Sequence, residues 1–197
     1  MLTLAGQQVS TLEIVAALTG LLSVWLARRM HIGTWPAGIV SVSCLAGVFF
    51  EAKLYADSVL QVAFAALSVY GWREWRRDPL AQDVLPVTHI RLREWLVLGL
   101  LGAAATALVA LFLISRTDSP APWPDAAILA FSLLATWAQA RRRLECWAIW
   151  IGVDLVAVPL YASRGLPLTA ALYLAYMMLC IAAWLQWEKR LSRASGS

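Results

Sequence analysis

The sequence has little charge. Only 14% of its 197 residues are charged, whereas 61% are hydrophobic and the mean hydropathy is +0.68. Soluble domains carry about 25% charged residues, and so few polar groups could not cover an apolar core of this size in water. The composition therefore indicates an integral membrane protein. The eleven Trp residues agree with this, because Trp favours the membrane interface.

The sequence also lacks the motifs of common catalytic sites. It contains no zinc-protease, nucleophile-elbow, P-loop or dinucleotide-binding pattern, and the two His residues, His31 and His89, fall in expected loops. Glu145 beside Arg143 fits a solvated helix start. We therefore expect no enzymatic activity, no catalytic residues and no cofactor.

Cysteines are few, and basic residues form no continuous patch. The three cysteines lie in or at the edge of apolar segments and form no CxxC pair (Cys44, Cys146 and Cys180). This spacing argues against a disulfide framework or a metal site. The basic residues stand in short groups between apolar runs, which is typical of topology signals in membrane proteins. We therefore expect contact with membrane lipid and no binding of nucleic acid.

Seven apolar segments predict an all-α membrane protein with seven transmembrane helices. Several of them are shorter than the roughly 20 residues of a simple span, which suits helices that pack around a cavity. The fourth carries no charge and is expected to face lipid most. The segments are Glu13–Ala27, Pro36–Phe50, Ser58–Trp75, Leu96–Ile114, Asp125–Ala140, Trp147–Tyr161 and Leu168–Trp187. Thr34, before Trp35 and Pro36, is expected to cap the second helix.

The basic residues predict the orientation in the membrane. With seven spans, thirteen of the sixteen Lys and Arg residues fall on one side, and only Lys53, Arg116 and Arg164 fall on the other. The side rich in Lys and Arg is expected to be cytoplasmic. The N-terminus is then outside the cell and the C-terminus in the cytoplasm.

A shift of 112 residues superposes the two halves of the chain without a gap. It pairs Trp with Trp four times, as in Trp25 with Trp137 and Trp35 with Trp147. The shift carries the first helix onto the fifth, so the two repeats are expected to be parallel. We predict a 3+1+3 arrangement with one three-helix repeat at residues 12–77, a linker helix at 94–115 and a second repeat at 124–190. Parallel repeats of this kind occur in transporters such as the SWEETs.

Two helices carry stripes of polar and aromatic residues that could line a pathway. Asp57, Gln61, Phe64, Ser68 and Trp72 share one face of the third helix, because their spacings follow the helical period. The 112-residue shift places Thr169, Tyr173, Tyr176, Cys180 and Trp184 on the seventh helix. The alternative is packing, since Ser, Thr and Gln often hydrogen-bond to neighbouring helices.

The sixth helix offers a further candidate, the carboxylate of Asp154. Cys146, Trp150 and Asp154 are spaced by four residues and share one face. A carboxylate at a lipid-facing helix centre costs at least roughly 2.5–3.5 kcal/mol, so Asp154 is expected to face the interior. Gly38 is the counterpart of Trp150, and we expect a flat substrate ring to stack on Trp150 in the space left there. The alternative roles are a packing carboxylate and a packed or interfacial Trp.

Several motifs resemble those of the PnuC-type nicotinamide riboside transporters. In the first half they are the runs YAD, LQ and YGWREW of residues 55–57, 60–61 and 70–75. In the second half they are RRLECWAIW of residues 142–150, VD of 153–154, PLY of 159–161, GL of 165–166 and TAALY of 169–173. The resemblance covers roughly residues 12–190, and its motifs fall in both repeats with the expected order and spacing.

The resemblance implies a SWEET-like transporter in the inner membrane of a bacterium, assembled as a homotrimer. Its substrate would be nicotinamide riboside, moved by facilitated diffusion and trapped in the cytoplasm by phosphorylation for NAD biosynthesis. Thiamine or riboflavin are alternative substrates, because nicotinamide riboside transporters usually carry Asn where this chain has Cys146. A seven-helix receptor or sensor is the alternative of another class. The candidate substrate-binding residues are Gln61, Phe64, Trp72, Cys146, Trp150, Asp154, Thr169 and Tyr173.

Overall fold

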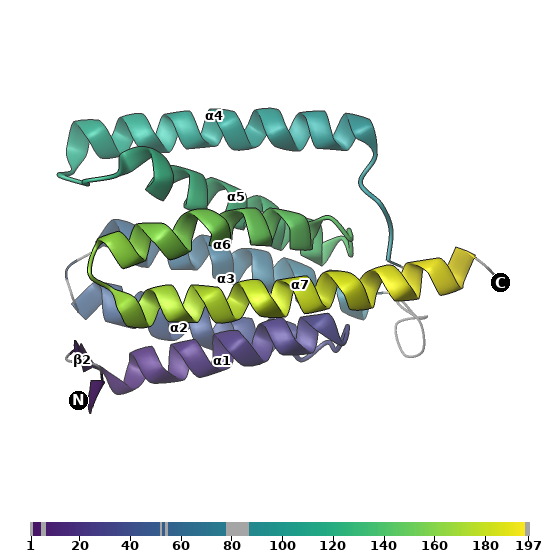
Figure 1. Ribbon diagram of the computed structural model, residues 1–197, viewed down its shortest axis with the longest axis horizontal. Helices are drawn as coiled ribbons and strands as arrows, with labels where there is room; N and C mark the ends of the chain where they lie inside the picture. Colours follow the sequence, from purple (N-terminus) through teal and green to yellow (C-terminus); the bar gives the residue numbers. More distant parts are fainter. Residues whose placement is uncertain (1, 5–6, 52, 54, 78–86, 196–197) are drawn as a thin grey trace. The chain divides into compact units, whose positions relative to one another are not determined.

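The computed structural model describes residues 2–4, 7–51, 53, 55–77 and 87–195. Within this part of the chain, seven α-helices follow a short β-hairpin (Figure 1). The hairpin pairs β1 (Leu2–Leu4) with β2 (Gln7–Val9) in antiparallel register. The helices are α1 (Thr11–Arg28), α2 (Thr34–Glu51), α3 (Tyr55–Arg76), α4 (Leu92–Arg116), α5 (Pro122–Ala140), α6 (Cys146–Ser163) and α7 (Pro167–Ser195).

The predicted all-α membrane fold with seven helices is confirmed. Five helices, namely α1, α2, α4, α6 and α7, are long and apolar enough to cross a membrane. The other two, α3 and α5, have 22 and 19 residues, which correspond to about 33 and 28 Å at 1.5 Å per residue. The hairpin of residues 2–9 was not predicted, and α7 continues eight residues beyond the expected end at Trp187.

The chain forms two compact units, residues 1–85 and 86–197. In the first unit, α1 packs against α2 and α2 packs against α3. In the second unit, α4 packs against α5, α5 against α6, and α6 against α7. Many outward side chains of α4 are apolar, with Leu96, Leu100 and Leu108 exposed by 61–72%. This exposure agrees with the expectation that the fourth helix faces lipid.

Hydroxyl groups tie α1 to α2 in the first unit. The Ser23 hydroxyl donates to the backbone carbonyl of Thr34 at 2.7 Å, and the Thr34 hydroxyl donates to the carbonyl of Ser23 at 2.9 Å. Further along, the Ser41 hydroxyl donates to the carbonyl of Ala16 at 2.7 Å. The expectation that Thr34 caps α2 is wrong, because α2 begins at Thr34 itself and its hydroxyl is used on α1.

The turns after α1 and α5 have the same backbone geometry. Met30 and Arg142, 112 residues apart, both adopt the left-handed conformation, with φ of 59° and 57°. The next N–H in each turn bonds to a carbonyl five residues back, from His31 to Leu26 at 2.9 Å and from Arg143 to Ala138 at 3.0 Å. The two turns therefore close their helices in the same way.

The turns after α2 and α6 match at the same offset. Lys53 has φ of 60° and its counterpart Gly165 has φ of 71°. Their N–H groups donate to the carbonyls of Phe50 and Ala162 at 3.0 and 3.1 Å. Left-handed φ is strained for most residues and natural for glycine, so the second half has the better residue for this turn.

One pair of Trp rings joins α2 to α3, and another joins α6 to α7. Trp35 meets Trp75 edge-on in the first unit, with ring centroids 5.4 Å apart and planes at 89°. Trp147 meets Trp187 in the second unit at 5.2 Å and 87°. All four rings are at most 3% exposed. Edge-on rings of this kind add about 0.5–1.5 kcal/mol beyond the burial of their area.

Candidate functional site

The predicted face of α6 is present in the structure. Cys146 and Asp154 are buried, with 0% and 2% of their surface exposed, and Trp150 between them is half-buried. Spacings of four residues bring these three side chains to one side of the helix. The Oδ2 atom of Asp154 has no hydrogen-bond partner among the described residues. A buried acceptor without a donor is costly, which makes this carboxylate the strongest candidate for contact with a ligand.

Helix α7 carries three side chains that lie close enough to this carboxylate to interact with it electrostatically. Tyr173, Tyr176 and Cys180 each interact electrostatically with Asp154, and Cys180 interacts in the same way with Cys146. The structure therefore brings together Asp154, Cys146 and Tyr173 among the predicted site residues. Tyr176 and Cys180, which belong to the predicted stripe on the seventh helix, join them.

Three tyrosines form a cluster between the C-terminal end of α6 and helix α7. Tyr161 stacks on Tyr173, with centroids 5.1 Å apart and planes at 30°, and Tyr173 meets Tyr176 edge-on at 6.1 Å. Neither Tyr161 nor Tyr176 is among the predicted substrate-binding residues, although Tyr176 lies on the predicted stripe of the seventh helix. The signal for Tyr161 was present, because it lies seven residues after Asp154 and therefore shares its face.

The remaining predicted residues are more scattered. Thr169 lies in the first turns of α7, half-buried and four residues before Tyr173. Gln61, Phe64 and Trp72 belong to α3 in the other unit, where Gln61 is buried and the two aromatic residues are half-buried. A common site for these three residues and the face of α6 stays a prediction.

The space beside Gly38 is smaller than the sequence suggests. A Cβ atom there would lie 3.2 Å from the Ser23 hydroxyl and 3.8 Å from the Ser68 hydroxyl. Part of the space beside this glycine is thus already occupied by side chains of α1 and α3. A larger residue at position 38 would disturb the first unit itself, so its effect on uptake could not be assigned to a substrate ring.

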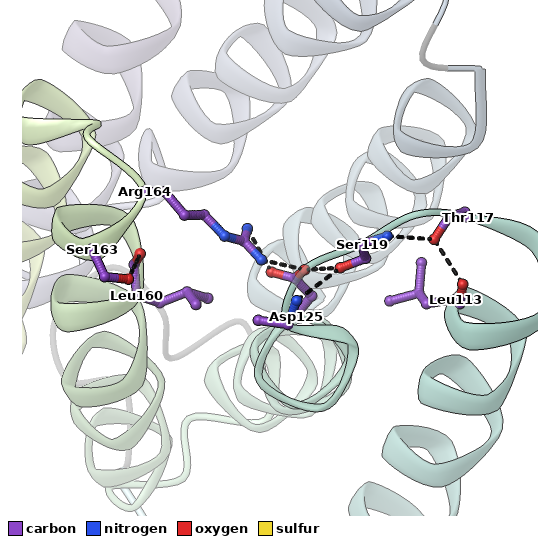
Figure 2. Close-up of polar contacts among 8 residues, drawn as sticks. Leu113, Thr117, Ser119, Asp125, Leu160, Ser163 and Arg164 are labelled. Atoms are coloured by element: carbon purple, nitrogen blue, oxygen red, sulfur yellow. Dashed lines mark hydrogen bonds and ion pairs between the residues drawn. The ribbon is translucent and has the colours of Figure 1, made fainter.

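An ion pair joins α5 to the end of α6 (Figure 2). The Arg164 guanidinium donates to both carboxylate oxygens of Asp125, at 3.0 and 2.8 Å. The Ser119 hydroxyl, from the preceding loop, donates to Asp125 Oδ2 at 2.8 Å. Hydrogen bonding to Asp125 raises the pKa of the Arg164 guanidinium above its ordinary value, so Arg164 stays charged. Two parallel bonds of this type fix geometry as well as charge.

A second polar network lies at the other end of these helices. Glu145 accepts hydrogen bonds from the Ile90 N–H at 2.9 Å and pairs with His89 Nδ1 at 2.8 Å. Arg143 pairs with Glu94 at 2.7 Å, and Thr88 forms a parallel bridge with Arg143. The expectation that Glu145 is a solvated helix start is wrong, because its side chain is only 12% exposed and holds the chain segment before α4.

The chemistry of these residues favours binding. Among the described residues, no three His, Cys, Asp or Glu side chains come together as a metal site would need. The cysteines are free thiols, and two of them are buried. A buried carboxylate among aromatic rings can accept a proton donor or attract a cation, while the rings offer faces for stacking. These groups make the face of α6 a candidate binding site.

Comparison with known proteins identifies the family. Residues 10–189 match the family described as "Nicotinamide mononucleotide transporter". The riboflavin/roseoflavin transporter RibM of Streptomyces davaonensis is 32% identical over 198 residues, which cover 98% of this chain and 91% of that protein. The nicotinamide riboside transporter PnuC of Escherichia coli K12 is 25% identical over 208 residues, covering 90% and 84%.

A solved structure agrees with the sequence matches. The crystal structure of the vitamin B3 transporter PnuC superposes with a TM-score of 0.75 at 25% identity, covering 92% of this chain and 82% of that one. The resemblance found in the motifs is thus confirmed over nearly the whole chain. The chain belongs to the nicotinamide mononucleotide transporter family, whose members are membrane transporters and not enzymes.

Proposed function

We propose that this protein carries nicotinamide riboside across the inner membrane of a bacterium by facilitated diffusion. The observation that supports this substrate is the carboxylate of Asp154, which is 2% exposed and has one oxygen without a hydrogen-bond partner among the described residues. A buried carboxylate needs a partner to offset its desolvation. A cationic pyridinium ring supplies one, and aromatic faces add attraction for the same charge.

The driving force is the removal of the product. The sequence contains no P-loop pattern for ATP, so we infer that uptake runs down the concentration gradient. Phosphorylation by a cytoplasmic kinase would keep the free substrate low inside the cell. The net flux would then feed NAD biosynthesis without energy coupling in this chain.

Riboflavin is the second candidate. RibM shares more identity with this chain than the PnuC of Escherichia coli does, 32% against 25%. Cys146 points the same way, because its thiol is buried and offers only weak hydrogen bonds in place of the amide usual in nicotinamide riboside transporters. For an uncharged flavin, Asp154 would serve as an acceptor for an N–H or hydroxyl group.

We assign roles to the site residues as follows. Trp150 stacks on the ring, Asp154 holds its charge or a donor, and Thr169 and Tyr173 supply hydrogen bonds from α7. Cys146 sets the polarity beside Trp150. Gln61, Phe64 and Trp72 of α3 are proposed to complete the contacts with substrate.

The matched turns and Trp pairs support the proposed organisation in two repeats. We assign residues 12–77 and 124–190 to the repeats and residues 94–115 to the linker helix. The basic residues support an N-terminus outside the cell and a C-terminus in the cytoplasm. Assembly as a homotrimer is carried over from the resemblance.

Uptake into proteoliposomes of the purified protein tests the proposal. Labelled nicotinamide riboside, thiamine and riboflavin are compared for the wild type, Trp150→Ala, Asp154→Asn and Trp123→Ala. Trp123 is 52% exposed at the start of α5, so its loss controls for removal of a Trp ring. We expect saturable uptake that Trp150→Ala abolishes and Trp123→Ala leaves intact.

The Asp154→Asn variant separates the two substrates. If the substrate is the cation, the neutral amide should lower its uptake by about tenfold or more, since the loss of one charge contact is worth about 1.5–3 kcal/mol. Uptake of a neutral flavin should fall much less. Absence of flux for all three compounds, with folded protein, would overturn the proposal.

A further inference from the structure

A groove between α4 and α5 lies outside the candidate site. It encloses about 620 Å³ and is lined by residues of these two helices and of the segment just before α4. No residue of α6 or α7 lines it. The groove depends on α4, the proposed linker helix.

The mouth of the groove is positively charged. Arg91, Arg93 and Glu94 line it, but the Glu94 carboxylate is already paired with Arg143 at 2.7 Å and accepts the Arg91 N–H at 3.1 Å. Arg91 and Arg93 are exposed, and neither has an ion pair among the described residues. Two uncompensated guanidinium groups therefore stand at the opening.

The positions of Arg91 and Arg93 are electrostatically unfavourable for α4. Both arginines lie at the N-terminus of α4, where the helix dipole is positive and repels cations. The same end attracts anions, because backbone N–H groups point outward there. Arg141 adds a third positive charge nearby, with its guanidinium 5.9 Å from the ring of Trp137, which lines the groove. The charges at this end fit an anionic group.

The rest of the groove is apolar. Val97, Leu101, Leu134 and Trp137 line it below the mouth, and Val97 and Leu101 are 47% and 54% exposed. Leu101 lies about 12–15 Å along the helix axis from the two arginines, at 1.5 Å per residue. An apolar channel of this length under a basic mouth matches a fatty acyl chain below a phosphate.

We propose that this groove binds one anionic phospholipid of the surrounding membrane. The phosphate would lie between Arg91 and Arg93, and one acyl chain would lie against Val97, Leu101 and Leu134. Basic pockets between transmembrane helices commonly bind anionic headgroups in this manner. The site is independent of the transported vitamin, because it shares no residue with the face of α6 and α7.

The test is lipid binding by the full-length protein. The protein is purified in mild detergent, phosphatidylglycerol or phosphatidylcholine is added, and bound lipids are counted by native mass spectrometry. We expect phosphatidylglycerol to bind the wild type about tenfold or more tightly than phosphatidylcholine, since each Arg near a headgroup is worth about a factor of five. The double variant Arg91→Gln/Arg93→Gln should lose this preference.

A matched variant controls for net charge. Arg73 and Arg76 are exposed near the end of α3, so Arg73→Gln/Arg76→Gln removes the same two charges elsewhere and should keep the preference. Leu101→Trp should fill the apolar part and lower the binding of both lipids. The unfolding temperature of each variant is measured to check that the variant is folded.

Two results would overturn the proposal. One is an unchanged preference for phosphatidylglycerol in Arg91→Gln/Arg93→Gln. The other is dissociation of the oligomer by Leu101→Trp with lipid binding unaltered, which would show that a second copy of the chain covers the groove.

Discussion

Gly71 on α3 leaves room for the ring of Trp35 on α2. A Cβ atom on Gly71 would lie only 2.5 Å from Cζ3 of that ring, closer than packed atoms tolerate. The glycine thus lets the Trp35 ring, which also meets Trp75 edge-on, lie directly against the backbone of α3. In the second unit the equivalent position holds Ala183, which is fully buried.

Gly71→Ala should therefore destabilise the protein, although Ala favours a helix over Gly. Overpacking of a filled core costs about 1–3 kcal/mol, which exceeds the gain of about 1 kcal/mol in helix propensity. The measurement is the unfolding midpoint in detergent. Ala183→Gly is the matched control and should lower stability mainly through helix propensity and a small cavity. Equal or higher stability of Gly71→Ala would show that the Trp35 ring can move aside.

The ion pair of Asp125 and Arg164 should stabilise the contact of α5 with the end of α6. Both side chains are 24% exposed, so we expect a coupling of about 1 kcal/mol, near the upper end for partly solvated pairs. A double-mutant cycle with Asp125→Asn and Arg164→Gln measures it. Asp118→Asn, in the loop between α4 and α5, is the control and should couple to neither. Additive effects of Asp125→Asn and Arg164→Gln would contradict the assignment.

Glu145 should hold the segment before α4 against the turn between α5 and α6. Glu145→Ala removes the acceptor of the Ile90 N–H and the partner of His89. Loss of such an anchor costs about 1–3 kcal/mol, so hydrogen exchange of the Ile90 amide should speed up by about tenfold or more. Glu188 is exposed, so Glu188→Ala is the control and should leave the exchange of the Ile90 amide unchanged. Unchanged exchange at Ile90 would mean that the backbone bridge between Thr88 and Arg143 suffices.

Cys146→Asn should shift the substrate preference toward nicotinamide riboside. Asn offers two donors and an acceptor where the thiol offers weak ones. We expect the uptake ratio of nicotinamide riboside to riboflavin to rise about tenfold, the effect of roughly 1.4 kcal/mol. Cys146→Ser, which adds a hydroxyl in a smaller volume, is the comparison. An unchanged ratio would remove Cys146 from the set of residues that determine specificity.

The helices and the equivalence of the two halves could be predicted from the sequence. Apolar runs indicate spans directly, and a constant offset of 112 residues between paired Trp residues requires equal local geometry. The turns at Met30 and Arg142 and the pairs Trp35–Trp75 and Trp147–Trp187 have matching geometry at this offset, and the two repeats themselves stay a prediction.

Contacts between distant residues could not be predicted in this way. Glu145 resembles a solvated residue beside Arg143, but its partners His89 and Ile90 lie 56 and 55 residues away, where no periodicity connects them. The small size of Gly38 suggests an empty space, whereas in the structure the side chain of Ser23 occupies part of that space. For Tyr161 the sequence indicates its face on α6, but its stacking on Tyr173 depends on how α6 meets α7.

The proposed passive transport of a vitamin is tested most directly by the final distribution of the vitamin across a membrane. Proteoliposomes are incubated with labelled nicotinamide riboside or labelled riboflavin, with and without imposed proton and sodium gradients. We predict saturable entry, an internal concentration that rises to the external one and no further, and no effect of either gradient on that level. Accumulation above the external concentration, or no entry of nicotinamide riboside or riboflavin into vesicles holding folded protein, would contradict the account.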